Sequence, residues 1–93
     1  MVVKVIYFAE FRKVTGKDSE EFELKNNTIK ELIHFLVQKY SKMQKLLWDK
    51  HSESINNNIS IIVNNKPIHD THNLSTFLKE GDEITFLLPI SGG

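Results

Sequence analysis

The sequence predicts an α+β domain in which a sheet of four to five strands packs on one long helix plus a short second helix. Three observations support this prediction. Dense apolar runs at residues 2–9 and 83–88 open and close the folded part of the chain, and such runs are typical of strands. An apolar stripe with helical spacing begins after Thr28. Turn signals separate shorter strand candidates in the second half.

The first strand, at residues 2–9, is so continuously apolar that we expect a central strand covered on both faces. Residues 10–16 are expected to form a connection with room for a helical turn. Residues 19–24 then alternate polar and apolar positions, which predicts a half-exposed strand with the acidic residues 20, 21 and 23 on its solvated edge. One face of the first strand carries Lys4, Ile6 and Phe8.

A capping box predicts the start of the long helix. The Thr28 hydroxyl can accept a hydrogen bond from the backbone N–H of Glu31, whose carboxylate can reach back. Ser41 is expected to cap the second, short helix, whose apolar residues would pack beneath the first. The long helix has a stripe formed by Ile29, Leu32, Ile33, Leu36, Val37 and Tyr40, and the short one offers Met43, Leu46 and Leu47, with Trp48 near its end.

The second half alternates loops and strands. Residues 49–58 are polar and rich in asparagine, which predicts a loop. Residues 59–63 form the next strand candidate, and Asn64-Asn65 suits a tight turn with positive φ. Residues 66–68 could form a short edge strand, where a proline is tolerated.

A long connection precedes the last strand. Residues 69–80 contain three apolar side chains that are expected to plug the core, and Gly81-Asp82 turns the chain into the strand at 83–88. The plug residues are Leu74, Phe77 and Leu78.

Composition indicates one ordinary globular domain. Of the 93 residues, 40% are hydrophobic and 26% charged, and the formal net charge is zero without a basic block, which argues against a nucleic-acid partner. No window approaches the ~18 apolar residues of a membrane span and no signal-peptide pattern is present, so we expect a cytoplasmic protein without a membrane partner. The absence of cysteine excludes disulfides, thiolate metal sites and cysteine nucleophiles.

The C-terminus suggests where any chemistry would reside. Pro89 cannot donate to a sheet ladder, so we expect a folded domain at residues 1–88 and a flexible Gly-Gly tail at 89–93. Gly92 and Gly93 lack Cβ atoms and could enter a channel too narrow for other residues. Without cysteine, the chain either performs no covalent chemistry or uses the terminal carboxylate. A chain end without function is the alternative.

Three motifs carry a resemblance that covers nearly the whole chain. Residues 8–16 (FAEFRKVTG) are similar to the pattern F-A-x-x-R-x-x-x-G, and residues 81–93 (GDE, then P-I-S-G-G) are similar to G-D-E…P-x-[ST]-G-G. Residues 63–64 match a recurrent V-N. These patterns resemble the MoaD/ThiS sulfur carriers, which have the ubiquitin-like β-grasp fold, and above all the small subunit of molybdopterin synthase. The resemblance implies a mixed sheet with the first and last strands parallel at its centre.

In that family the terminal glycine carries the chemistry, which implies a role for Gly93 here. An ATP-dependent activating enzyme, an adenylyltransferase, would adenylate its carboxylate, and a sulfur donor would displace AMP to leave a thiocarboxylate. The large subunit of molybdopterin synthase would then receive the tail and pass sulfur to a pterin precursor in molybdenum cofactor biosynthesis. The chain itself would be a non-catalytic subunit with no permanently bound cofactor.

A surface for these partners is expected near the tail. If Ile84, Phe86 and Leu88 face the core, Thr85 and Leu87 face outward. Phe8 and Leu87 would then form an exposed apolar patch, unless Phe8 belongs to the core. Arg12 could hold its own loop, meet a partner carboxylate or form a structural salt bridge. The expected partner-binding residues are Phe8, Arg12, Leu87, Pro89, Ile90 and Ser91, and the reacting residues are Gly92 and Gly93.

Other functions stay open at this point. A ubiquitin-like modifier would use the same activation to join Gly93 to lysines of other proteins, and a non-covalent interaction module would not need the tail. A carrier for another pathway, such as thiamine synthesis, is a further alternative, although thiamine carriers are typically shorter and lack the segment at residues 43–48. His69 and His72, with Asp70 nearby, are interpreted as loop residues rather than a metal site.

Overall fold

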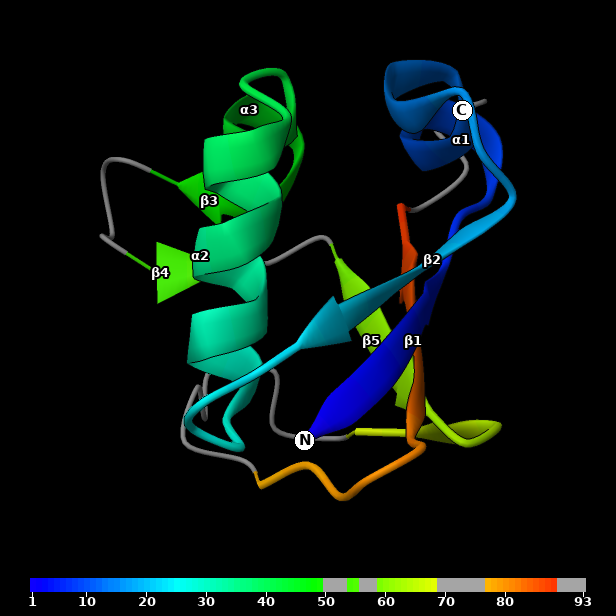
Figure 1. The fold of residues 1–93 in the computed structure, drawn as a ribbon. Helices are drawn as coiled ribbons and strands as arrows, with labels where there is room; N and C mark the ends of the chain where they lie inside the picture. Colours follow the sequence, from blue (N-terminus) through cyan, green and yellow to red (C-terminus); the bar gives the residue numbers. More distant parts are fainter. Residues whose placement is uncertain (50–53, 56–58, 69–76, 89–93) are drawn as a thin grey trace.

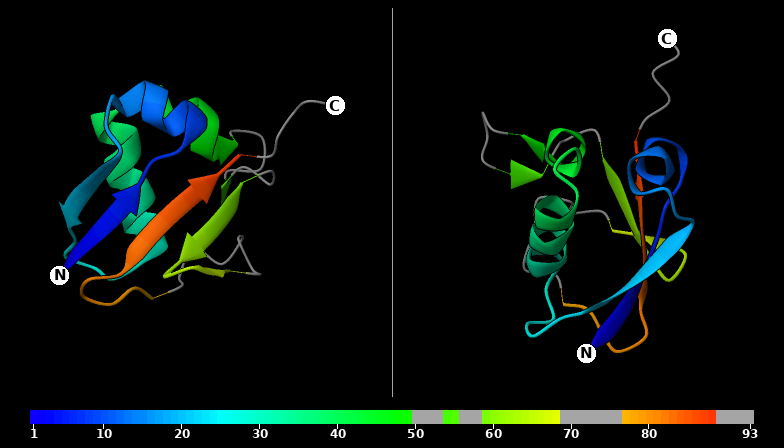
Figure 2. Two further views of the ribbon diagram at one scale, coloured as in Figure 1. Left: turned by 90° about the vertical axis from the view of Figure 1, so that its right-hand side faces the viewer. Right: turned by 45° about the horizontal axis from the view of Figure 1, so that its top comes forward.

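The computed structural model describes residues 1–49, 54–55, 59–68 and 77–88 (Figure 1). Within them, a five-stranded sheet packs with one face against the helices α2 and α3, and a two-stranded sheet lies beside these helices (Figure 2). The predicted α+β class is confirmed. In chain order the elements are β1 (Val2–Ile6), α1 (Ala9–Thr15), β2 (Ser19–Glu23), α2 (Ile29–Lys39), α3 (Met43–Leu47), β3 (Trp48–Asp49), β4 (Ser54–Ile55), β5 (Ser60–Val63), β6 (Lys66–Pro67) and β7 (Glu83–Leu87).

The large sheet has the order β2-β1-β7-β5-β6 and is mixed. β1 and β7 run parallel at its centre, with Lys4 opposite Glu83 and Ile6 opposite Thr85, and the other neighbours are antiparallel. The two most apolar runs of the sequence therefore pair as expected. Because parallel strands point the same way, their carboxyl ends reach the same edge of the sheet.

The two faces of β1 differ, so the expectation that both are covered is wrong. Val3 and Val5 are fully buried and Tyr7, just after the strand, is 2% exposed, whereas Lys4 and Phe8 on the other face are exposed. The reason is that α2 and α3 cover only one face of the sheet (Figure 2). The predicted division of this strand into two faces is confirmed.

The long helix begins as predicted but with half of the capping box. The Thr28 Oγ1 accepts the Glu31 backbone N–H at 3.2 Å. The Glu31 carboxylate does not return to Thr28; it accepts the backbone N–H groups of Lys25 and Asn26, which order the preceding turn. Of the apolar stripe, Val37 and Tyr40 are half-buried, and the fully packed residues are Ile29, Leu32, Ile33 and Leu36.

The other helices differ from expectation in detail. The helix α1 occupies most of the expected connection at 10–16 and begins earlier, at Ala9, while β1 ends at Ile6, so the expected strand at 2–9 was too long. Phe11 of α1 is 2% exposed and packs against Phe86 with ring centroids 6.2 Å apart. The N-cap of α3 is Lys42, without a side-chain cap, so the assignment of Ser41 is wrong. Met43 and Leu47 are buried, as predicted.

The second half has one unexpected sheet and one unexpected side chain. Asp49 belongs to β3, which pairs with β4, so residues 49–58 are not all loop. Leu78 is buried but Phe77 is 72% exposed, so Phe77 does not plug the core. Leu74 lies outside the described residues. The turn at Asn64-Asn65 has the predicted positive φ values, 52° and 68°, and leads into the predicted edge strand β6.

Candidate functional site

The edge of the sheet where β1 and β7 end is the candidate site. β7 ends at Leu87, and α1 lies at this edge (Figures 1 and 2). We call the group Phe8, Ala9, Arg12, Leu87 and Leu88 the carboxyl edge. The tail follows directly in the sequence, and its predicted site residues lie outside the described ones: Pro89, Ile90, Ser91, Gly92 and Gly93.

Phe8 is an outward-facing residue and not part of the core. Its side chain is 49% exposed, and it occupies the N-cap of α1 without making a side-chain cap hydrogen bond. Leu88 packs against the core, as the predicted alternation requires. Leu87 faces the other way, but its side chain is half-buried and therefore less exposed than expected.

The outer face of the sheet extends the apolar surface beyond the two predicted residues. Thr85 lies on the outer face but is only 9% exposed, because it lies between Ile6 on β1 and Ile62 on β5. Ile6 and Ile62 are themselves half-buried without packing against the core. The alternation of β5 marks Ile62 as outward, but only the cross-strand register brings it close to Thr85, so the sequence did not reveal it.

The motif at residues 8–16 is explained partly by backbone conformation. Ala9, at the start of α1, has φ 49°, in the left-handed region that costs an alanine of the order of 1–2 kcal/mol. Gly16 ends the helix with φ 71° and donates its N–H to the Arg12 carbonyl at 2.8 Å. A Cβ at Gly16 would meet nothing within 4 Å, so glycine is needed there for its φ and not for space.

Arg12 is held in a salt bridge. Its Nε lies 2.7 Å from Oδ1 of Asp18, and the two side chains are 62% and 79% exposed. The pair joins α1 to the segment that leads into β2. An exposed pair of this kind contributes roughly 0–1 kcal/mol to folding. The structural salt bridge is therefore present, and Arg12 is accessible to a partner as well.

The other two motifs meet at the opposite end of β7. Asp82 is 9% exposed, and its carboxylate accepts the Asn64 side-chain amide at 2.8 Å and the Lys79 backbone N–H at 2.7 Å. The Asn64 Oδ1 in turn accepts the Glu83 backbone N–H at 2.9 Å. We call this the Asp82–Asn64 network. It fixes the turn before β7 against the end of β5, so G-D-E and V-N serve the fold.

A second polar group lies beside the carboxyl edge. Glu20 was expected on a solvated strand edge, but its side chain is 9% exposed. It accepts hydrogen bonds from Tyr7 at 2.9 Å, Tyr40 at 2.7 Å and Lys17 at 3.2 Å, and it pairs with Lys39. We call these five residues the Glu20 cluster.

The Glu20 cluster shifts three pKa values: those of Glu20 and Tyr7, and that of Lys17, which is raised by its hydrogen bond to Glu20. Burial by itself would raise the pKa of Glu20, but the hydrogen bonds from Lys39, Tyr40, Tyr7 and Lys17 outweigh it and lower the pKa to about 2. Burial, then the hydrogen bond to Glu20, and then the Glu20 charge raise the pKa of the Tyr7 hydroxyl. Glu20 is therefore ionised at neutral pH and holds Tyr7, the residue before Phe8, by a charge-assisted hydrogen bond.

Two further predictions concern ligands and membranes. The part of the chain that the structure describes contains no group of three or more potential metal-ligating side chains, and the pair His69 and His72 lies outside that part. Among the described helices, the longest is α2 with 11 residues, and none has the length and apolarity to cross a membrane.

A mixed sheet with parallel central strands that packs on one long helix is the ubiquitin-like β-grasp fold. The model described as the ThiS family matches residues 5–93, and the chain belongs to this family. It is thus a small ubiquitin-like sulfur carrier or modifier. A search of curated protein sequences gave no significant match.

Solved structures agree with this assignment. The chain is 30% identical to small archaeal modifier protein 1 from Methanosarcina acetivorans, with 99% of this chain and 96% of that one covered and a TM-score of 0.83. It is 28% identical to a Pyrococcus furiosus protein described as a candidate molybdopterin converting factor, subunit 1 (96% and 98% covered, TM-score 0.74). It is 26% identical to a chain in the BexX/CysO complex of Amycolatopsis orientalis (98% and 99% covered, TM-score 0.77).

Proposed function

We propose that this chain is a sulfur carrier of the molybdopterin synthase small-subunit type, with Gly93 as its reacting terminus. The observation that carries the proposal is that the family match runs through Gly92-Gly93 and that the tail follows β7 directly at the carboxyl edge. The likeness to the Pyrococcus furiosus protein supports the molybdopterin pathway in particular.

The proposed chemistry needs an activated carboxylate. The Gly93 carboxylate attacks the α-phosphorus of ATP, held by an activating enzyme of the MoeB type, and pyrophosphate leaves. A sulfur donor then attacks the acyl carbon, the bond to AMP breaks, and AMP leaves with the electron pair. The resulting thiocarboxylate passes its sulfur to a pterin precursor, and water restores the carboxylate. This chain supplies the reacting group, and its partners supply ATP and the catalytic residues.

The carboxyl edge is proposed as the docking surface for both enzymes. Phe8 offers an exposed aromatic ring, and Leu87, with Ile6 and Ile62, continues it over the open sheet face. Arg12 remains accessible beside them. Pro89, Ile90 and Ser91 would lead Gly92-Gly93 into the active site of the large subunit, a MoaE-like protein. The BexX/CysO complex, in which a chain similar to this one is bound to another protein, supports docking of this kind.

Intact-mass measurement tests the reacting group. The full chain is incubated with a cognate activating enzyme, ATP and sulfide, and we expect a mass gain equal to the exchange of one oxygen for sulfur. The chain lacking Gly93 should show no gain. If an activating enzyme of demonstrated activity leaves the mass unchanged, the carrier chemistry is refuted. Adding the large subunit and pterin precursor should then return the mass to its starting value, and a carrier for thiamine or another metabolite would fail this second step.

Protein modification is the second candidate function, and the likeness to small archaeal modifier protein 1 favours it. The same adenylate of Gly93 would be attacked by a lysine amine of another protein, with release of AMP and formation of an isopeptide bond. Conjugates that survive denaturation, contain the Gly93-lysine linkage and disappear when Gly93 is deleted would identify this function. A thiocarboxylate without such conjugates would identify the carrier alone.

A further inference from the structure

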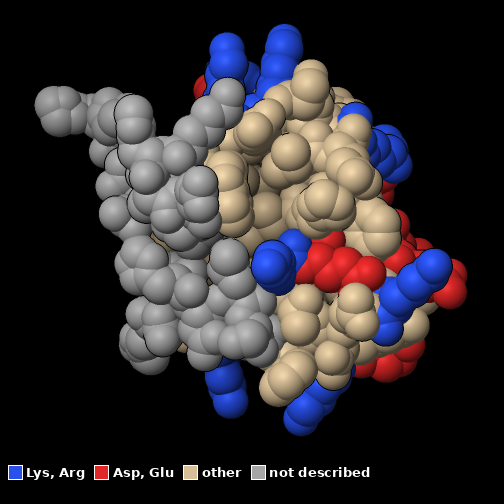
Figure 3. Space-filling view, turned by 90° about the vertical axis from the view of Figure 1, so that its left-hand side faces the viewer, with Lys and Arg blue, Asp and Glu red and all other residues tan. Residues whose placement is uncertain are grey.

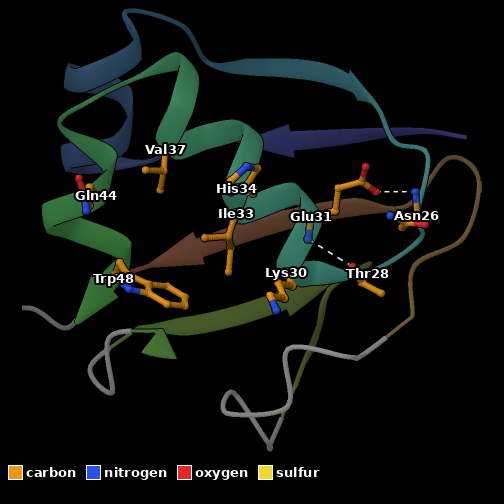
Figure 4. Close-up of a pocket in the computed structure, with 9 residues that line it drawn as sticks. All are labelled: Asn26, Thr28, Lys30, Glu31, Ile33, His34, Val37, Gln44 and Trp48. Carbon is orange, nitrogen blue, oxygen red and sulfur yellow. Dashed lines mark hydrogen bonds between the residues drawn. The ribbon is translucent and has the colours of Figure 1, made fainter. Parts of the chain in front are cut away.

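The face of the molecule formed by α2 and β3 carries a cavity that the tail chemistry does not use. Its volume is about 650 Å³, and it lies between α2, α3 and the turn before α2 (Figures 3 and 4). None of its described lining residues belongs to the carboxyl edge. They are Asn26, Thr28, Lys30, Glu31, Ile33, His34, Val37, Gln44 and Trp48.

The cavity has an apolar wall. Ile33 is 3% exposed and lies deep, whereas Val37 and Trp48 are half-buried. Ile33 and Val37 project from α2 into the space and the Trp48 indole faces them from the other side (Figure 4). This explains why Val37, although part of the apolar stripe, is not fully covered: its side chain borders the cavity instead of the sheet. Binding a ligand that covers this apolar surface is favourable, because it removes the surface from water.

The polar groups of the cavity include donors and acceptors, and they differ in whether they already have a partner. Both Glu31 oxygens already accept backbone N–H groups, and the His34 Nε2 lies 3.0 Å from the Gln38 amide nitrogen. Within the described part of the chain, the Lys30 ammonium, the Trp48 indole N–H and the Gln44 amide make no hydrogen bond or ion pair. Lys30 is therefore the charged lining residue that has no hydrogen bond or ion pair in the described part of the chain. The Glu31 carboxylate keeps its charge, but both of its oxygens are turned to backbone N–H groups.

We propose that this cavity binds a small apolar monocarboxylate, with its hydrocarbon body on Ile33, Val37 and Trp48 and its carboxylate at Lys30. A few polar groups around a mostly apolar concavity of several hundred Å³ is the usual design of a small-molecule site. An apolar cation would meet Lys30 as a like charge. The site is independent of Gly93, so a carrier and a modifier would both possess it.

Trp48 makes the proposal directly measurable because it is the only tryptophan in the chain. The full chain is titrated at neutral pH with octanoate, octan-1-ol and octylammonium, which share one hydrocarbon body, and Trp48 emission is recorded. We expect saturable changes with octanoate as the tightest ligand and octylammonium as the weakest. Lys30→Met should weaken octanoate binding roughly twofold to fivefold, as the loss of an exposed ionic contact would, and leave octan-1-ol binding unchanged. Lys66→Met on β6, which does not line the cavity, is the matched control.

Three results would overturn the proposal. Equal affinity for octanoate and octan-1-ol would remove the role of the carboxylate, and so would an unchanged octanoate affinity in Lys30→Met. If the change in Trp48 emission does not saturate with any of the three probes, the cavity is not a small-molecule site. If only a partner protein changes Trp48 emission, the cavity belongs to a protein interface instead. Far-ultraviolet circular dichroism checks that the variants keep the fold, which Lys30 on an exposed helix position should not disturb.

Discussion

The two ends of β7 differ in burial and hydrogen bonding, although residues of the same family motifs lie at both. At its start, Asp82 and Asn64 are tied to each other and to the backbone, and Asp82 is nearly covered. At its end, Phe8 keeps half of its surface in solvent and Ala9 adopts an unfavourable φ. The Asp82 and Asn64 side chains at the first end are hydrogen-bonded, whereas the second end leaves the Phe8 ring exposed to solvent. Motif membership alone therefore does not distinguish a structural residue from a docking residue; burial and hydrogen bonding do.

The largest expected effect on stability comes from the start of β7, where the Asp82–Asn64 network lies. Asp82→Ala removes the acceptor of two hydrogen bonds and leaves the Asn64 amide and the Lys79 N–H without it, so we expect the free energy of unfolding to fall by about 2–3 kcal/mol. Urea unfolding measures this. Asp18→Ala, which breaks only the exposed pair with Arg12, should cost less than about 1 kcal/mol. Equal losses in the two variants would contradict the assignment of Asp82 to the fold.

The second effect depends on pH and concerns Glu20, which holds Tyr7 beside the carboxyl edge. The pKa of Glu20 is about 2 in the folded chain against an ordinary 4.5, so its contribution to stability is complete above pH 4.5 and is lost as pH falls towards 2. The difference between 4.5 and about 2 corresponds to roughly 3 kcal/mol at neutral pH, and screening by solvent reduces this to about 2 kcal/mol. Glu20→Gln should therefore be less stable by about 2 kcal/mol at neutral pH, and the deficit should shrink as the pH approaches 2.

Urea unfolding of both proteins at neutral pH and near pH 2.5 tests this expectation. Glu21→Gln on the exposed side of β2 serves as the matched control, since it changes the same charge without the cluster. A deficit that stays constant between the two pH values would show that Glu20 acts by packing and not by its charge.

The contrast between the two ends also marks the limit of sequence analysis. The strand periodicity of residues 2–9 placed Phe8 on the same face as Lys4, and the helical spacing after Thr28 located the core side of α2. Local patterns suffice for such features because they depend on neighbours in the chain. Glu20 was misplaced because its partners, Tyr7 and Tyr40, lie 13 and 20 residues away and only the fold brings them together.

The candidate site shows the same division. Alternation gave the face on which Phe8 lies but left its exposure open, and the burial of Thr85 follows from its cross-strand neighbours Ile6 and Ile62. Phe77 was assigned to the core on apolarity alone, and its backbone instead pairs with Thr28 while its ring faces solvent. The cavity beside Trp48 could not be predicted, because it forms only when α2 packs against α3 and no sequence periodicity indicates that arrangement.

The third prediction separates binding from stability at the docking end. Phe8→Asp should weaken binding to the activating enzyme at least about tenfold, because it replaces the exposed ring with a charge, equivalent to about 1.4 kcal/mol. Aspartate is also a favourable N-cap, so the gain for α1 should offset the lost apolar contact and leave folding stability within about 1 kcal/mol of the parent. Affinity by calorimetry and urea unfolding measure the two effects. Unchanged affinity in a folded variant would exclude Phe8 from the interface.

The smallest effect concerns the strain at Ala9. Glycine adopts φ near 49° without the Cβ clash, so Ala9→Gly should raise the free energy of unfolding by up to about 1 kcal/mol, even though glycine normally destabilises a helix. Lys13→Gly inside the same helix should lower it by about 1 kcal/mol. Opposite signs in these two variants would show that Ala9 is strained; a loss in both would show that it is not. If the relaxed Ala9→Gly chain also binds its activating enzyme less tightly, the strained turn holds Phe8 in the orientation that the partner recognises.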